Sequence, residues 1–156
     1  MITEAEMLAV SSRLASVKSQ QDIAAALAIY HPDIELISPS FDSVSRGEAE
    51  AEKNLHVFFA LFPDYQVALS EYACKDAMML ATGTVSVTPQ IPDHPCPRVT
   101  VPVFLELHFE GELIVKETFF LDAGLICKRA GITPEQLRAA AQIASTQPTQ
   151  KEHQAC

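Results

Sequence analysis

The segment FEGELIVKETFFLDAGLICKRAG, residues 109–131, joins a turn, a strand and a short helix in direct succession. The EG pair is typical of a hairpin turn, and the apolar, β-branched and aromatic run from Leu113 to Leu121 predicts a strand, because such side chains pack well on a pleated sheet. Asp122 then precedes a segment that ends at Gly131, the usual pattern of an N-capped short helix. We therefore expect a sheet whose last strand leads directly into a helix.

Three further strands are predicted before this segment. They are YQVALSEYAC (65–74), AMMLATGTVSV (77–87) and RVTVPVFLELHF (98–109), all rich in β-branched and aromatic residues. The connections are a KD pair, a proline-rich loop and the EG turn, so consecutive strands are expected to run antiparallel.

The last two predicted strands are apolar on both faces. One face carries Val101, Val103, Leu105 and Leu107, and the other carries Phe104 and Phe120. A sheet of this kind needs cover on both sides. We expect helices to cover one face and a second copy of the chain to cover the other, which predicts a homodimer through the outer sheet face.

The first half of the chain is mostly helical by its apolar spacing. Helices are expected over 3–18, 19–31 and 48–62, with one strand over 33–38 between the second and third. Pro32 stops the second helix, and a Ser-rich loop closed by Arg46 and Gly47 follows the strand. A last helix is expected over 133–144, where Thr133 and Gln136 form a capping box.

The overall composition is that of one compact domain. With 156 residues, of which 48% are hydrophobic and 20% charged, the chain can bury a sizeable core. We expect a single domain over 1–145 and a flexible polar tail over 146–156. The net charge of −9, without any basic block, argues against a nucleic-acid partner.

Metal, export and membrane signals are weak. The four cysteines contain no CxxC pair, which suits a reducing cytoplasm. The N-terminus lacks a basic segment followed by an apolar one, and no apolar run approaches a membrane span, so neither export nor membrane insertion is expected. Asp93, His94 and Cys96 are metal-ligand types, but no second group has matching spacing, so no metal site is predicted.

The order of the expected elements resembles the nuclear transport factor two-like, or SnoaL-like, α+β cone fold. The resemblance covers about residues 3–131, and is carried by YHPDIELISPS (30–40), RGEAEAEKNLHVFFALFPDYQV (46–67) and residues 109–131. It implies a curved antiparallel sheet packed on three N-terminal helices, short C-terminal helices and a cone-shaped pocket. Relatives such as polyketide cyclases and ketosteroid isomerase imply acid/base chemistry on a hydrophobic small molecule, without a cofactor.

Aromatic and thioether side chains are the candidates for the pocket wall. They are Phe58, Phe62, Phe104, Phe120, Met78 and Met79. Such a wall would suit a flat or polycyclic ligand. The alternative for each of these residues is ordinary core packing.

The acids that the resemblance implies are absent at the matching positions. The base of the isomerase branch matches Ser38, and the working acid of the cyclase branch matches Phe119, or Thr118 if one residue is inserted. Because none of these side chains is acidic, Ser38 and Thr118 are predicted to orient a substrate.

Other side chains must then carry any proton transfer. Glu106 lies in an otherwise apolar strand, and His56 lies between Leu55 and Val57 in the predicted helix over 48–62, so these two are the candidate catalytic residues. Asp122 is either a catalytic carboxylate or the N-cap of the closing helix, and its position before a short helix favours the cap.

The register of the last hairpin decides what surrounds Glu106. A three-residue connection would set Glu106 opposite Lys116, as an ion pair. A two-residue turn would put Glu106 on the same face as Glu117, as a carboxylate pair in which one acid keeps its proton.

Two functions are open at this point. The first is a cofactor-free isomerase, cyclase, dehydratase or hydrolase that acts on a hydrophobic, flat or polycyclic molecule in the cone pocket. The alternative is a dimeric ligand-binding or assembly domain without catalysis, which the missing acids favour. The enzyme is the prediction here, by analogy, because the resembling proteins that have a pocket are mostly catalytic.

Overall fold

The computed structural model describes residues 1–147. The elements in chain order are α1 (Glu4–Ser19), α2 (Ile23–Leu27), β1 (Tyr30–Ser38), a 3-10 helix η1 (Pro39–Phe41), β2 (Ser43–Arg46), α3 (Glu48–Leu61), β3 (Gln66–Lys75), β4 (Met78–Val87), β5 (Val99–Glu110), β6 (Leu113–Leu121), α4 (Ala123–Ala130) and α5 (Pro134–Thr146). Helix α5 therefore includes the first residue of the predicted tail, and 148–156 lie outside the described residues.

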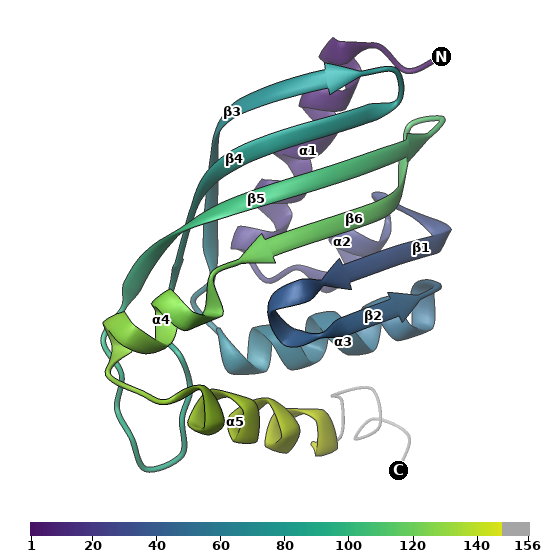
Figure 1. Cartoon of the computed structure of the whole chain (residues 1–156). Coiled ribbons are helices and arrows are strands. Elements are labelled where there is room, and N and C mark those ends of the chain that lie inside the picture. The colour runs from purple at the N-terminus through teal and green to yellow at the C-terminus, as the bar shows by residue number, and fades with distance from the viewer. Residues whose placement is uncertain (148–156) are drawn as a thin grey trace.

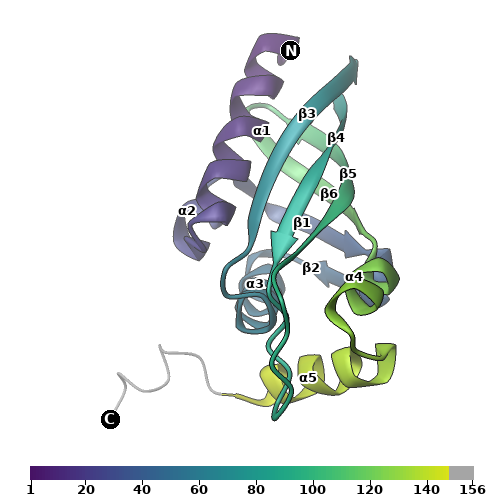
Figure 2. The same ribbon diagram turned by 90° about the vertical axis from the view of Figure 1, so that its left-hand side faces the viewer.

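The described strands form one curved sheet in the order β2-β1-β6-β5-β4-β3 (Figure 1). Strands β3 to β6 are antiparallel neighbours in succession, as the sequence predicted, whereas β1 runs parallel to β6. Figure 2 shows α1, α2 and α3 on one face of the sheet, with α4 and α5 at one end. The predicted α+β fold is confirmed.

The helix boundaries follow the predicted capping residues. Thr3 and Glu6 form a capping box at α1, and Thr133 and Gln136 form another at α5. Asp122 accepts a hydrogen bond of 2.9 Å from the backbone N–H of Leu125 at the start of α4. Each cap satisfies backbone donors that have no partner within the helix.

The segment around Tyr30 differs from the prediction. Helix α2 ends at Leu27, and β1 already begins at Tyr30 and continues through Pro32. Proline is tolerated in this strand because the pairing with β6 is irregular between Tyr30 and Glu35, so no ladder donor is needed there. The predicted Ser-rich loop also contains a short strand, β2, which pairs with β1.

The register of the last hairpin matches neither alternative. The turn has two residues, Gly111 and Glu112, but the register shifts by one between His108 and Phe109. Because Val115 is the extra residue of this bulge, Glu106 lies opposite Thr118. Glu117 consequently faces the helices, not Glu106.

The sheet face opposite α1, α2 and α3 carries exposed apolar side chains. Phe104 and Phe120 are directly paired across β5 and β6, and are 57% and 45% exposed. Leu80 on β4 and Val44 on β2 are also exposed. This outer face is the surface that the sequence predicted to need a partner.

Candidate functional site

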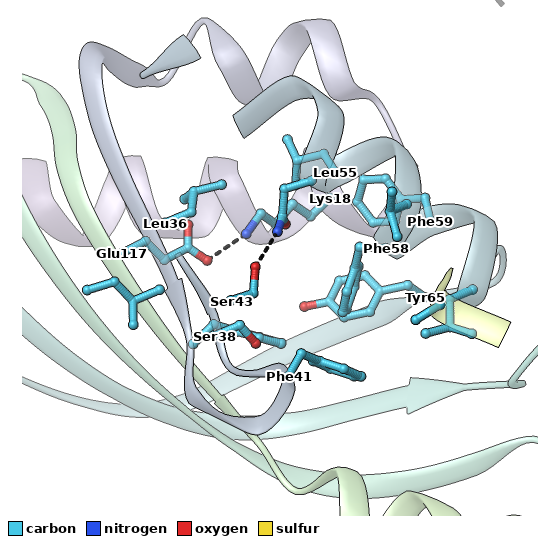
Figure 3. A pocket seen from close by; sticks show the side chains of 16 residues that line it. Lys18, Leu36, Ser38, Phe41, Ser43, Leu55, Phe58, Phe59, Tyr65 and Glu117 are labelled. Carbon is cyan, nitrogen blue, oxygen red and sulfur yellow. Dashed lines mark hydrogen bonds and ion pairs between the residues drawn. The ribbon is translucent and has the colours of Figure 1, made fainter. Parts of the chain in front are cut away.

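A cavity of about 220 Å³ lies between α3, the end of β1 and the middle of β6 (Figure 3). Its wall is largely apolar, with polar side chains from α1, β1, β2, α3 and β6. The lining residues are Lys18, Leu36, Ile37, Ser38, Phe41, Ser43, Asn54, Leu55, Val57, Phe58, Phe59, Leu61, Tyr65, Glu117, Phe119 and Ala141. The described residues thus contain a pocket of the kind that the resemblance implied.

Phe58 is the centre of the aromatic part of this wall. Its ring centroid lies 5.1 Å from Phe62, 5.2 Å from Tyr65 and 5.9 Å from Phe119, all in edge-to-face contacts. Such contacts hold each ring in a fixed orientation. The cluster therefore offers a preformed aromatic surface to a ligand.

A buried carboxylate, Glu117, lies at the other side of the cavity. Its side chain is 2% exposed. Oε1 accepts a hydrogen bond of 2.6 Å from Lys18 Nζ, and Oε2 accepts one of 2.6 Å from the hydroxyl of Tyr30. The Lys18 side chain is itself only 12% exposed, so the ion pair is held away from water.

The charge of Glu117 acts on the phenol groups of Tyr30 and Tyr65. Burial and the negative charge of Glu117 raise the pKa of both Tyr30 and Tyr65 well above the usual value for tyrosine. Both side chains therefore remain protonated donors at neutral pH. The Tyr30 hydroxyl donates to Glu117, whereas no side-chain hydrogen bond is made by the Tyr65 hydroxyl within residues 1–147.

Ser38 is the second unused polar group. Its hydroxyl oxygen is buried and, among the described residues, has no hydrogen-bond partner. Figure 3 shows Glu117 opposite Phe58 and Phe59, with Ser38, Ser43 and the Tyr65 hydroxyl between them. Since an unsatisfied buried hydroxyl is costly, the Ser38 hydroxyl is suited to a hydrogen bond with a polar ligand.

The predicted catalytic residues lie outside this cavity. Glu106 is on the outer face, where its Oε1 lies 2.7 Å from His108 Nε2. His56 is partly exposed on α3, with Nε2 3.9 Å from Glu52 Oε1. Asp122 caps α4, as the sequence favoured. The structure brings none of these three to Glu117.

The predicted substrate-binding residues divide between the two faces of the sheet. Ser38 and Phe58 line the cavity, and Phe62 is buried directly behind Phe58. Phe104, Phe120 and Thr118 belong to the outer face, because each pairs in register with an outward residue of β5 or β6. Met79 is buried in the core, and Met78 faces outward opposite His108.

Lys18, Tyr30 and Tyr65 were not predicted as site residues from the sequence. Lys18 lies in the last turn of α1, and Tyr30 was assigned to a helix that ends earlier. Glu117 was considered only as a neighbour of Glu106. An acid in the middle of the apolar run 113–121 was the available signal, but its face depends on the bulge at Val115.

A family model described as the SnoaL-like domain matches residues 12–117. The chain belongs to the SnoaL-like family. This assignment agrees with the curved sheet and the cavity described above. No curated protein matches this SnoaL-like chain.

Solved structures share the fold of this SnoaL-like chain at low sequence identity. A hypothetical protein with a ketosteroid isomerase-like fold from Catenulispora acidiphila DSM 44928, in complex with trimethylamine, is 11% identical, with a TM-score of 0.73 over 81% of this chain and 95% of that chain. A candidate SnoaL-like polyketide cyclase from Jannaschia sp. CCS1 is 15% identical, with a TM-score of 0.72 over 84% and 95% of the two chains. AclR, a candidate hydroxylase from Streptomyces galilaeus, is 20% identical, with a TM-score of 0.69 over 85% and 100%. The TM-scores show a common fold, and at these sequence identities they show the fold alone.

Within residues 1–147 of this SnoaL-like chain, each helix is too short or too polar to span a membrane. In the same residues, no three His, Cys, Asp or Glu side chains gather in a way that would hold a metal ion.

Proposed function

We propose that the cavity binds a small aromatic molecule with a carbonyl group, and that Glu117 removes a proton from the carbon beside that carbonyl. The observation that carries this proposal is the buried Lys18–Glu117 ion pair beside an aromatic wall and two unused hydroxyls. A buried ion pair is rarely a gain in stability over apolar packing. Polar groups that converge in an apolar pocket are instead typical of binding and acid/base sites.

The cavity volume sets the size of the ligand. An apolar cavity of about 150 Å³ can hold benzene, and sites for drug-sized molecules begin at about 300 Å³. A cavity of about 220 Å³ therefore favours a molecule of one or two rings. This narrows the flat or polycyclic ligand expected from the sequence to the smaller end of that class.

The contacts of Glu117 leave it able to accept a proton. Each carboxylate oxygen has two lone pairs, and Lys18 and Tyr30 occupy one on each oxygen. A donor from Tyr65 would stabilise the negative charge that develops on the carbonyl oxygen as the proton leaves. Ser38 would supply a second donor to the same oxygen.

Proton exchange tests this proposal without knowledge of the natural substrate. We expect the chain to accelerate exchange of the α-protons of 2-tetralone, a two-ring ketone, in deuterated buffer, followed by NMR. Glu117→Gln should slow the catalysed exchange by about 100-fold or more, because it removes the general base. Glu112→Gln, at the exposed hairpin turn, is the matched control and should leave the rate unchanged.

Glu106→Gln separates the sequence hypothesis from the structural one. Loss of exchange in Glu106→Gln, with full activity in Glu117→Gln, would assign the chemistry to the outer face and overturn the role of Glu117.

A second candidate function is ligand binding without catalysis. The specific observation in its favour is that both oxygens of Glu117 already accept hydrogen bonds. Saturable chemical-shift changes of cavity residues on addition of 2-tetralone, without any acceleration of exchange, would support this alternative.

We further propose that a second copy of the chain covers the outer sheet face. Phe104 and Phe120 are exposed there side by side, and exposed apolar patches commonly mark interfaces. Sedimentation velocity at micromolar concentration should give a dimer for the wild type and a monomer for Phe104→Arg. Tyr72→Arg, at a similarly exposed aromatic residue on the other face of the sheet, should remain dimeric. A monomeric wild type would contradict this arrangement.

A further inference from the structure

Lys18 differs from the exposed lysines of the described chain in its surroundings. Its ammonium lines the cavity and lies 5.8 Å from the ring centre of Tyr30 and 5.7 Å from that of Phe119. Lys53, by contrast, is exposed on α3. Lys18 is thus a primary amine held against aromatic rings at the edge of a binding cavity.

Lys18, Glu117 and Tyr30 form a chain of two short hydrogen bonds. Lys18 Nζ lies 2.6 Å from one oxygen of Glu117, and the other oxygen lies 2.6 Å from the Tyr30 hydroxyl. Enzymes that use a side-chain nucleophile place it within hydrogen-bond reach of a base, which a third group orients. The three residues have this arrangement, with the amine as the nucleophile, the carboxylate as the base and the phenol as the orienting group.

We infer that Lys18 is a nucleophile that forms an imine with an aldehyde or ketone bound in the cavity. The inference rests on the proposed function, because it needs a carbonyl compound to enter the site. It goes beyond that function by adding a covalent intermediate. Lysine is suited to this role because its amine reacts readily with carbonyl carbons once it has lost its proton in an apolar site.

Formation of the imine needs only the bound ketone and the side chains of Lys18 and Glu117. The ammonium of Lys18 transfers a proton to Glu117, and the free amine then attacks the carbonyl carbon, so that a C–N bond forms and the carbonyl electron pair moves to oxygen. The oxygen takes up two protons, one returned by Glu117 and one released from the nitrogen, and leaves as water. The net change converts a ketone and an ammonium group into a protonated imine and water, without any oxidant or reductant.

The partners of the ligand oxygen are already present in the cavity. Tyr65 and Ser38 have hydroxyls without hydrogen-bond partners among the described residues, and both line the same cavity as Lys18. These hydroxyls would hold the oxygen during attack and dehydration. The same imine would make the neighbouring carbon more acidic, which favours removal of its proton.

Reductive trapping tests this inference. The full chain is incubated with 2-tetralone and sodium cyanoborohydride, which reduces an imine to a stable secondary amine, and the modified peptides are mapped by mass spectrometry. We expect modification of Lys18 to exceed that of Lys53 by about tenfold or more, because proximity and the adjacent base accelerate attack. Lys18→Arg, which keeps a positive charge beside Glu117, should abolish the adduct, and Lys53→Arg should retain it.

The outcomes distinguish this inference from the proposed function. Equal modification of Lys18 and Lys53, with α-proton exchange still accelerated by the wild type, would overturn the imine and leave Glu117 as the base. Absence of both preferential trapping and exchange would overturn both proposals. The ratio of Lys18 to Lys53 modification in the wild type tests the imine even if Lys18→Arg does not fold.

Discussion

Replacement of Glu117 by leucine is expected to lower the free energy of unfolding by about 3–5 kcal/mol, because it leaves the Lys18 ammonium buried without a counter-charge. The Tyr30 hydroxyl would lose its acceptor at the same time. A loss of this size is a large part of the stability of about 5–15 kcal/mol that typical proteins have. Urea denaturation measures this loss directly, and the melting temperature should fall by about 6–20 °C.

A double substitution shows whether the unpaired Lys18 charge causes the lower stability of Glu117→Leu. In Lys18→Met combined with Glu117→Leu no buried charge remains, so most of the stability should return. Glu117→Gln should cost less than Glu117→Leu, because an amide oxygen still accepts a hydrogen bond. If Glu117→Leu alone were as stable as the wild type, the Lys18–Glu117 contact would not be buried in solution as the structure has it.

Replacement of Gly83 by alanine is expected to cost about 3 kcal/mol, through overpacking against rigid backbone. A Cβ at this position of β4 would lie 2.1 Å from the carbonyl oxygen of Ala68 and 2.9 Å from the Cα of Leu69. Both atoms belong to the main chain of β3, next to the irregular pairing between Leu69 and Glu71. No side-chain rotation can relieve this contact, so the two strands must move apart. Equilibrium denaturation in urea is the measurement.

Gly124→Ala is the matched control for Gly83→Ala. Gly124 is exposed in α4, and a Cβ there would meet only the side chain of Asp122, at 3.5 Å. The substitution should leave stability unchanged or raise it by up to about 1 kcal/mol, since alanine favours helix more than glycine does. A loss below about 1 kcal/mol for Gly83→Ala would show that β3 and β4 adjust freely at this point.

The fold could be predicted because its signals are local. The capping boxes at Thr3 and Thr133 and the apolar strands after residue 65 each depend on residues close in sequence. Where the prediction was wrong, a long-range contact decided the outcome. Tyr30 belongs to β1 because β6 pairs with it, and nothing in the Ala-rich run before it reports that pairing.

The site could be predicted only in part, for a similar reason. Ser38 was identified from the resemblance and Phe58 as an aromatic candidate for the pocket wall, and both line the cavity. The contact of Lys18 with Glu117 joins residues 99 positions apart, and so depends on how α1 lies against the sheet. The candidates that were chosen, Glu106 and His56, stood out as polar residues in apolar surroundings, but a sequence pattern alone does not distinguish the two faces of a sheet.

The bulge at Val115 determines which side chains of β6 meet a ligand. Without this bulge, the same two-residue turn would pair Leu107 with Lys116 and Glu106 with Glu117, so Lys116 and Thr118 would face the helices and Glu117 the outer face. A shift of the hairpin register by one residue would thus exchange an acidic pocket for a basic one without any change in the sequence. New pocket chemistry on this scaffold can therefore arise from slippage of one strand as well as from substitution.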